Sequence, residues 1–109
     1  SRVRGYLEEK GYRIVCEDMA KEDGKYYFIM RAVHGKEENP YQEEELMYGR
    51  ELLKMRHPVL KEFLFREKRM KEGICRDLDN LKNERVKVRK EELRHELDVI
   101  EKALRRYEE

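Results

Sequence analysis

The side chains best suited to nucleophilic chemistry are two cysteines, because the chain has no threonine and one serine, Ser1. A thiol attacks as the thiolate, so it needs a neighbouring base or cation. The expected strand pairing puts Arg31 opposite Cys16, whereas His34 falls several positions away. We therefore predict that Cys16 and Cys75 are free structural thiols and that no residue is catalytic, with cysteine-dependent activity as the alternative.

Carboxylates beside cations on a strand are the second candidate for chemistry. Glu17 and Asp18 lie near Lys10 and Arg13, an arrangement that resembles metal-dependent nucleases with acidic groups along a hairpin. Such a site needs a second inward carboxylate to hold a cation, and the second strand offers Arg31 there instead. The glycines stand singly rather than in a phosphate-binding loop, and no CxxC pair is present. We therefore predict neither a metal site nor a cofactor.

Two arginine and histidine pairs form a third candidate. Arg50 precedes His57 by seven residues, and Arg89 precedes His95 by six. This spacing resembles the active motif of helical, metal-independent ribonucleases, and the resemblance implies arginine and histidine acting together on RNA. With 14 arginines in the chain, one near each histidine is expected by chance. The alternative interpretation is a set of cations near helix ends, where they interact with carbonyl groups.

A basic segment is a candidate for binding rather than catalysis. Six cations stand close together just before an apolar seam, with three glutamates among them, and could contact nucleic-acid phosphates. They are Lys82, Arg85, Lys87, Arg89, Lys90 and Arg94. The outline resembles the basic-zipper DNA readers. The net charge of +1 gives no global attraction for nucleic acid, so a solvated helix face or ion pairs with a neighbouring subunit is the competing interpretation.

The apolar seam that follows predicts an interface between subunits. Its residues recur at alternating spacings of three and four, as in helices that pack on a partner helix. They are Val86, Leu93, Leu97, Ile100, Leu104 and Tyr107. We predict a non-catalytic protein-interaction module that forms a homo-oligomer, with a dimer favoured, or binds a partner helix. The alternative is a small DNA- or RNA-binding regulatory protein that uses residues 82–94 and dimerises through its last helix.

The elements that position these residues begin with a short helix and a hairpin. Residues 3–10 show helical spacing and end at Gly11, while residues 12–20 and 25–34 are rich in strand-forming side chains around Asp23-Gly24. A two-residue turn at that dipeptide predicts a register in which four pairs lie opposite each other. These pairs are Cys16 with Arg31, Ile14 with Val33, Met19 with Phe28, and Glu22 with Lys25.

Helices are predicted for the rest of the chain. Asn39 and Pro40 are typical of a helix start, with Gln42 closing a capping box, and His57-Pro58 ends that helix. A second apolar seam follows Pro58 and is made up of Leu60, Phe63, Met70, Ile74, Leu78 and Leu81. Residues 58–108 then either turn near residues 79–83 or continue as one helix about 75 Å long, and we favour the turn.

Length and composition limit the remaining choices. The 109 residues suit one domain, which we divide into residues 1–35, 39–57 and 58–108. Charged residues (47%) outnumber apolar ones (39%), a bias typical of thermophile proteins and of helices with one buried stripe. No apolar run reaches the roughly 18 residues that a membrane span needs. We predict a mostly helical α+β fold, no membrane partner and a cytoplasmic location.

Overall fold

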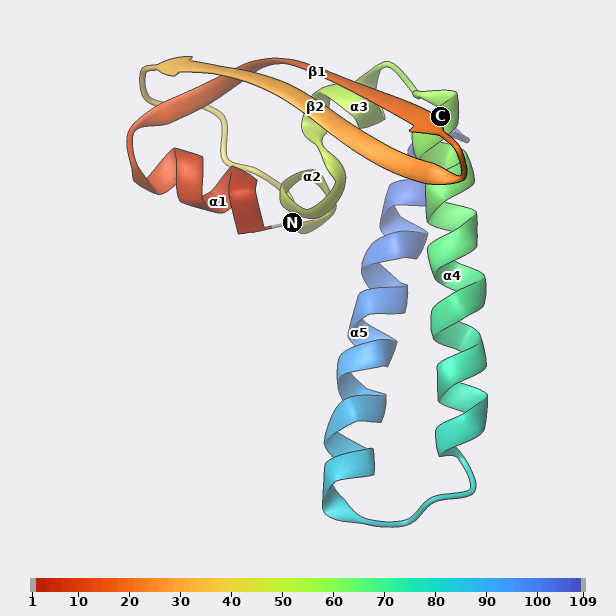
Figure 1. The fold of residues 1–109 in the computed structure, drawn as a ribbon. Helices are drawn as coiled ribbons and strands as arrows, with labels where there is room; N and C mark the ends of the chain where they lie inside the picture. The colour runs from red at the N-terminus through yellow and green to blue at the C-terminus, as the bar shows by residue number, and fades with distance from the viewer. Residues whose placement is uncertain (1, 109) are drawn as a thin grey trace.

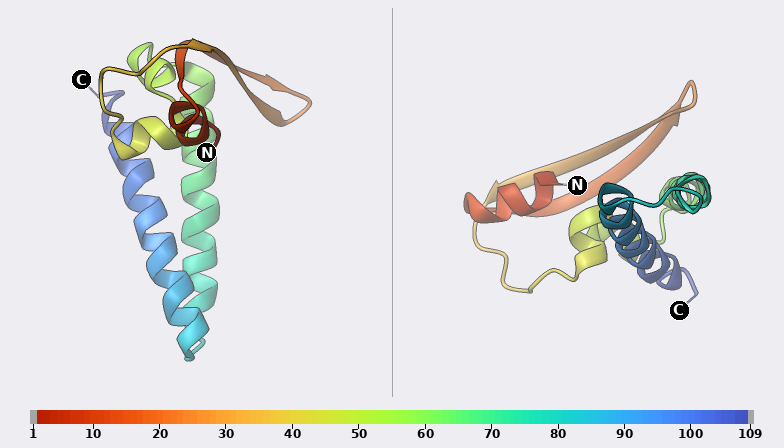
Figure 2. Two further views of the ribbon diagram at one scale, coloured as in Figure 1. Left: turned by 90° about the vertical axis from the view of Figure 1, so that its left-hand side faces the viewer. Right: turned by 90° about the horizontal axis from the view of Figure 1, so that it is seen from below.

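The fold is a helical arm attached to a smaller part that carries a β-hairpin (Figure 1). The computed structural model describes residues 2–108, so Ser1 lies outside the described residues. The elements are α1 (Arg2–Glu9), β1 (Tyr12–Glu22), β2 (Lys25–His34), α2 (Glu43–Tyr48), α3 (Arg50–Lys54), α4 (Pro58–Leu78) and α5 (Glu84–Arg105). The α4 and α5 helices lie side by side as the helical arm, and α1, the hairpin and the two short helices gather at one end of it (Figure 2). This mostly helical α+β fold is the one predicted.

The hairpin turns where its sequence predicts. Asp23 and Gly24 both take positive φ angles, 51° and 77°, which a two-residue turn of this kind requires. Three of the four predicted pairs are confirmed: Cys16 with Arg31, Met19 with Phe28 and Glu22 with Lys25. Local turn chemistry therefore determines the register of this half of the hairpin.

The fourth predicted pair is wrong because β1 contains a bulge. The register shifts between Ile14 and Cys16, so Ile14 lies opposite Ala32 rather than Val33. An extra residue in one strand moves every later pair by one position. For the same reason His34 pairs with Tyr12 and not with Arg13, and its ring stacks on the tyrosine with centroids 4.3 Å apart.

The first helix ends as predicted but buries an unexpected side chain. Gly11, with φ of 84°, follows α1, and its N–H donates to the carbonyl of Glu8. The apolar residues Val3 and Tyr6 stay exposed, whereas Arg4 is 1% exposed. The helix is therefore held by a buried charge rather than by an apolar stripe.

The predicted helix over residues 39–57 is two shorter helices. The first of them, α2, begins at Glu43 with Gln42 as its N-cap, so the expected start at Asn39 is wrong. Gly49, with a φ of 107°, separates α2 from α3. The predicted end is confirmed: His57 caps α4, its Nδ1 accepting from the N–H of Val59. The break at Gly49 has a tertiary cause, which is described with the functional site.

The predicted turn between the last two helices is confirmed. The α4 helix ends at Leu78 and α5 begins at Glu84, where the side chain of Asn83 accepts from the N–H of Val86. Residues 58–108 are thus two antiparallel helices. None of the helices in residues 2–108 is long and apolar enough to cross a membrane.

The core sits where the arm meets the short helices. Its buried apolar members are Met19, Tyr48, Leu52, Leu53, Leu60, Leu64, Val99, Ile100, Ala103 and Leu104. On α4 the buried positions are Leu60 and Leu64, whereas Met70 and Ile74 are exposed, so the predicted α4 seam is wrong beyond its first residue pair. Toward the turn, ion pairs between the helices replace apolar contacts.

The seam of α5 is occupied within the chain. Leu93, Ile100 and Leu104 are buried, Leu97 and Tyr107 pack against the core, and Val86 is half-buried. The partner helix that the spacing indicates is α4 of the same chain. The apolar surface that led us to predict an interface between subunits is therefore already covered.

Candidate nucleic-acid interface

A buried ion pair fixes the hairpin to the short helices. Arg4 Nε donates to Glu17 Oε2 at 2.8 Å, and Arg4 Nη2 lies 2.7 Å from the same oxygen. The other oxygen of Glu17 accepts from the backbone N–H of Glu51 at 3.0 Å, and Arg4 Nη1 donates to the carbonyl of Met47. The pair thus joins α1, β1, α2 and α3 at one point, and both side chains are almost fully buried.

Gly49 makes room for this pair. A Cβ built on Gly49 would lie 2.7 Å from Glu17 Oε2 and 2.8 Å from Arg4 Nη2, closer than atoms can approach. Its φ of 107° is also one that other residues rarely adopt. The helix therefore breaks at Gly49 because the buried charges pass directly against its backbone.

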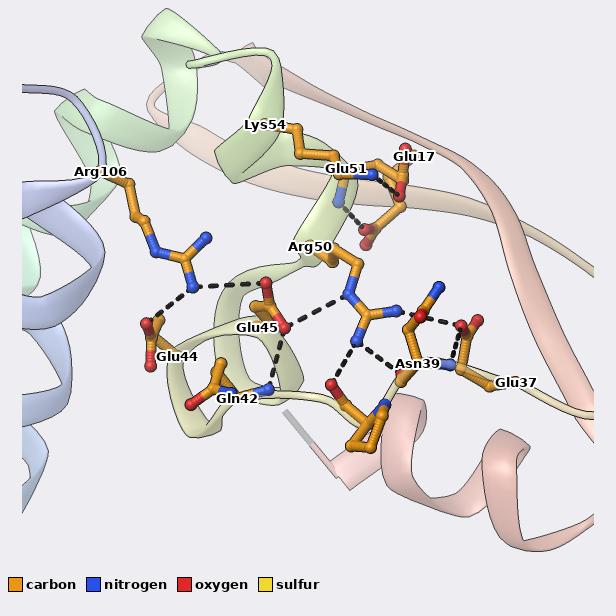
Figure 3. A network of polar contacts seen from close by, with 11 residues as sticks. Glu17, Glu37, Asn39, Gln42, Glu44, Glu45, Arg50, Glu51, Lys54 and Arg106 are labelled. Carbon is orange, nitrogen blue, oxygen red and sulfur yellow. Dashed lines mark hydrogen bonds and ion pairs between the residues drawn. The ribbon is translucent and has the colours of Figure 1, made fainter. Parts of the chain in front are cut away.

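A second network holds α2 against the base of the arm (Figure 3). Arg50 reaches Glu37 Oε1 at 3.1 Å and Glu45 Oε1 at 3.2 Å, while Arg106 from beyond α5 reaches Glu44 at 2.9 Å and Glu45 at 3.3 Å. Arg50 also donates to the carbonyls of Asn39 and Pro40 and stacks over Tyr41. These carboxylates are neutralised by arginines from two directions, so the network orients the arm relative to the hairpin.

The charge of Glu45 makes this network sensitive to acid. Burial alone would raise the pKa of Glu45, but the N–H of Gln42 and the guanidinium groups of Arg50 and Arg106 outweigh it and hold the pKa below 4.5. A carboxylate with a lowered pKa in the folded state stabilises the fold above its unfolded pKa, and this stability is lost as pH falls through the folded value. We expect the urea midpoint of unfolding to fall between pH 5 and about pH 3.

The matched variant for this prediction is Glu45→Gln. It lacks the titrating group, so its urea midpoint is expected to fall less over the same pH range than that of the unsubstituted protein. Other carboxylates, such as Asp18, also have a lowered pKa and contribute to the remaining fall. Parallel pH profiles for the two proteins would contradict the role of Glu45.

The arginine and histidine pairs do not come together as an acid and base. Arg50 is bound to Glu37, whereas His57 Nε2 lies 2.8 Å from Asp18 Oδ1. Arg89 binds glutamates of its own helix, and His95 Nε2 lies 2.5 Å from Glu43. Each side chain has a structural partner, so the geometry does not support the ribonuclease resemblance.

The residues considered as a nucleophile and as metal ligands do not form such sites in the described residues. Cys16 lies exposed opposite Arg31, while His34 pairs at the far end of the hairpin. Glu17 is the buried partner of Arg4 rather than a metal ligand. Within the part of the chain that the structure describes, no three His, Cys, Asp or Glu side chains converge as a metal site would require.

The predicted basic segment divides between two sides of α5. Lys87, Lys90 and Arg94 recur at helical spacing and, with Glu91, line a shallow hollow of about 290 Å³. We call these three cations the α5 basic flank. Lys90 also binds Asp79 at 2.8 Å and holds the pKa of that carboxyl below its usual range.

The other three cations of the segment lie elsewhere. Arg85 and Arg89 line the opposite side of α5 with Val88 and two glutamates, and Arg89 is neutralised by Glu92 and Glu96 at 3.1 and 3.0 Å. Lys82 lies at the turn of the arm. The sequence thus indicates a basic region correctly but overstates how many of its cations face one way.

Comparison with solved structures defines the class of the fold. A Bacillus subtilis tRNA m1A22 methyltransferase, TrmK, matches with a TM-score of 0.83 at 20% identity, over 94% of this chain and 46% of its own. An uncharacterized protein from Listeria monocytogenes matches with a TM-score of 0.83 at 24% identity, covering 94% and 46%. A Streptococcus pneumoniae protein in complex with S-adenosyl-L-methionine matches with a TM-score of 0.75 at 22% identity, covering 94% and 41%. The chain spans less than half the length of these proteins.

The family follows from the sequence itself. Residues 1–102 match the model of the TrmK family, tRNA (adenine(22)-N(1))-methyltransferase, and the chain belongs to this family. No curated protein matches the chain.

This membership corrects the predicted function. The prediction of a non-catalytic, oligomerising interaction module is wrong, and so is the alternative of a small DNA- or RNA-binding regulator, because the family is one of RNA-methylating enzymes. The prediction that the protein is not an enzyme is wrong for the same reason. The sequence analysis missed this function because none of the residue patterns that it considered is specific to methyl transfer.

Proposed function

We propose that this chain belongs to a tRNA methyltransferase that modifies the N1 atom of an adenine, and that it holds the tRNA through its helical arm. The observation that carries the proposal is the family match over residues 1–102. The arm is the longest element of the fold and bears the α5 basic flank on its surface. Cations on an extended helix are suited to the phosphate backbone, which supplies most of the affinity for nucleic acid.

The described residues do not fit the cofactor of a methyltransferase. A hollow of about 510 Å³ between the hairpin and α3 is lined mainly by charged and polar side chains, among them Arg50 and Glu45, which are already bound to each other. A nucleoside cofactor is usually held in an apolar pocket with a few polar groups, often beside a glycine-rich turn. We therefore assign residues 2–108 to RNA binding and place no step of methyl transfer on them.

The outer face of the hairpin supports a place within a longer enzyme. Tyr27 and Ile29 are 47% and 53% exposed on the side of β2 that turns away from Met19 and Phe28. A two-stranded sheet with an uncovered apolar face is marginal in water. We propose that the remainder of the methyltransferase packs on this face, consistent with matched structures more than twice as long as the chain.

The test is titration of the 109-residue chain with unmodified tRNA at two salt concentrations. Replacing Lys87, Lys90 and Arg94 by glutamine is expected to weaken binding at least tenfold and to reduce the salt dependence by about three units of slope. The fold is expected to persist, since Lys87 and Arg94 are exposed and the one ion pair that is lost, Lys90 with Asp79, lies near the turn of the arm, away from the buried core. Binding that does not depend on salt, or that is absent from the unsubstituted chain, would overturn the proposed function.

The matched control replaces three cations far from the arm. Lys25, Arg31 and Lys36 are exposed on or beside the hairpin. Their conversion to glutamine gives the same change in net charge, and we expect it to leave tRNA affinity within about threefold. An equal loss in both variants would show that only net charge matters.

A further inference from the structure

The side of α4 that faces away from α5 carries three arginines and one glycine. Arg66, Arg69, Gly73 and Arg76 recur at spacings of three, four and three, so they share one face of the helix. Buried Leu64, two residues before Arg66, points in the opposite direction, into the arm. We call this set the α4 arginine face.

Two of the three arginines of this face are not paired within the described residues. Lys68 and Lys71, on the inner side of the same helix, bind Glu101 and Glu96 at 2.7 and 2.8 Å. Within residues 2–108, neither Arg69 nor Arg76 makes an ion pair. Unlike the cations that tie the two helices together, these arginines are therefore available to an external anion.

Arg66 and Asp77 lie at the two ends of the α4 arginine face. Arg66 is stacked over the ring of Tyr26, with its guanidinium carbon 5.4 Å from the ring centre, and is thereby anchored to the hairpin. Asp77 borders the face near the turn of the arm and is exposed. Two further carboxylates lie close by: Glu62 is one turn before Arg66 and is paired with Lys21, and Glu72 stands between Arg69 and Arg76 in the sequence. The three arginines extend along about three turns of helix, or roughly 15 Å.

Gly73 has no structural reason to lack a side chain. Glycine is the least favourable residue after proline in a helix interior. A Cβ built on Gly73 would meet one atom, Arg76 Nη2, at 3.8 Å, an ordinary contact, and its φ is not positive. Alanine would therefore fit and would favour the helix, so packing does not explain the glycine. Its bare backbone is what a close-approaching partner requires.

We propose that the α4 arginine face binds the phosphate backbone of tRNA, with the backbone seated against Gly73 between Arg69 and Arg76. This inference rests on the proposed function and adds a second contact surface, on the opposite helix from the α5 basic flank. Arginine forks match phosphate oxygens in pairs. The exposed apolar side chains of α4 border this face rather than occupy its centre at Gly73, so RNA fits it better than an acidic protein. These side chains are Phe65, Met70 and Ile74.

Three variants test the proposal in the 109-residue chain with unmodified tRNA. The double variant Arg69→Gln, Arg76→Gln is expected to weaken tRNA binding roughly tenfold and to reduce the salt slope by about two units. Gly73→Ala is expected to weaken binding about threefold while raising the urea midpoint of unfolding, because alanine is the better helix former. Asp77→Asn is expected to strengthen binding, since it removes an opposing charge.

The control is Arg105→Gln, which removes an exposed arginine at the other end of the arm and is expected to leave affinity unchanged. If the unsubstituted chain binds tRNA but the double variant and Gly73→Ala bind equally well, this inference fails while the proposed function stands. If the unsubstituted chain does not bind tRNA, the proposed function fails and this inference fails with it. Tight binding of poly-glutamate, lost in the double variant while tRNA binding is retained, would show an acidic protein partner instead.

Discussion

Replacing Gly49 by alanine is expected to separate the hairpin from the short helices and to destabilise the protein strongly. The added Cβ would lie 2.7 Å from Glu17 Oε2 and 2.8 Å from Arg4 Nη2, two buried charges that have no room to move. Separating a buried ion pair costs about 3–5 kcal/mol. Forcing alanine into the φ of Gly49 adds about 1–3 kcal/mol. Together these costs approach the whole stability of a domain of this size, roughly 5–15 kcal/mol.

Gly24→Ala is the matched control for Gly49→Ala. Gly24 also has a positive φ, 77°, but a Cβ there would meet no atom within 4 Å. Its substitution is expected to cost about 1–2 kcal/mol, the backbone penalty alone. Urea unfolding followed by circular dichroism measures both. Similar losses for the two variants would mean that the buried ion pair tolerates displacement.

Glu17→Gln is expected to destabilise the protein by about 3–5 kcal/mol, because it leaves the Arg4 charge buried without a counter-charge. Arg4 is 1% exposed and its nearest oxygens belong to Glu17 and the carbonyl of Met47. Glutamine keeps the size of the side chain and an oxygen for the N–H of Glu51, so the loss reports the missing charge. Urea unfolding at pH 7 measures it.

Two comparisons make this result specific. Glu62→Gln removes a carboxylate that pairs with Lys21 on the surface, where water screens the charges, and it is expected to change stability far less than Glu17→Gln. The double variant Arg4→Met, Glu17→Leu is expected to recover much of the loss, since apolar residues of similar volume can replace a buried pair. Additive losses in the double variant would contradict the coupling of the two charges.

The hairpin was predictable because its determinants are local. Asp23 and Gly24 supply the positive φ angles of the turn. Counting residues outward from this turn along both strands gives three of the observed pairs. The bulge near Val15 was not predictable, since the residues around it carry no sequence signature of a register shift. Beyond it, every predicted pair was displaced by one position.

A buried ion pair explains why the single helix predicted over residues 39–57 is two helices in the structure. The apolar spacing of Tyr48, Leu52 and Met55 continues through Gly49, so periodicity alone predicts one helix. The isolated glycine was the available signal for a break. Gly49 interrupts the helix because the Arg4–Glu17 ion pair lies against it. Those two residues are thirteen positions apart, and no local pattern indicates that they pair.

The candidate site was predictable in part. A dense run of cations marked α5 correctly, but only three of them share the α5 basic flank. The arginines of α4 were missed because glutamates separate them along the chain, and helical spacing alone does not show which cations are already paired. Membership of an enzyme family was not predicted, because none of the residue patterns considered is specific to methyl transfer and the family is shown by the match over residues 1–102.

The arm is apolar at its root and polar toward its turn. Leu60 and Ile100 are fully buried near the hairpin, whereas Lys71 with Glu96 and Lys90 with Asp79 connect the helices farther out. Water-accessible ion pairs oppose separation far less than buried leucines do. The free energy needed to open a backbone hydrogen bond therefore declines from the root of the arm to its turn. Amide hydrogen exchange is expected to become faster in the same direction. The outer turns can spread apart while the root keeps the arm aligned.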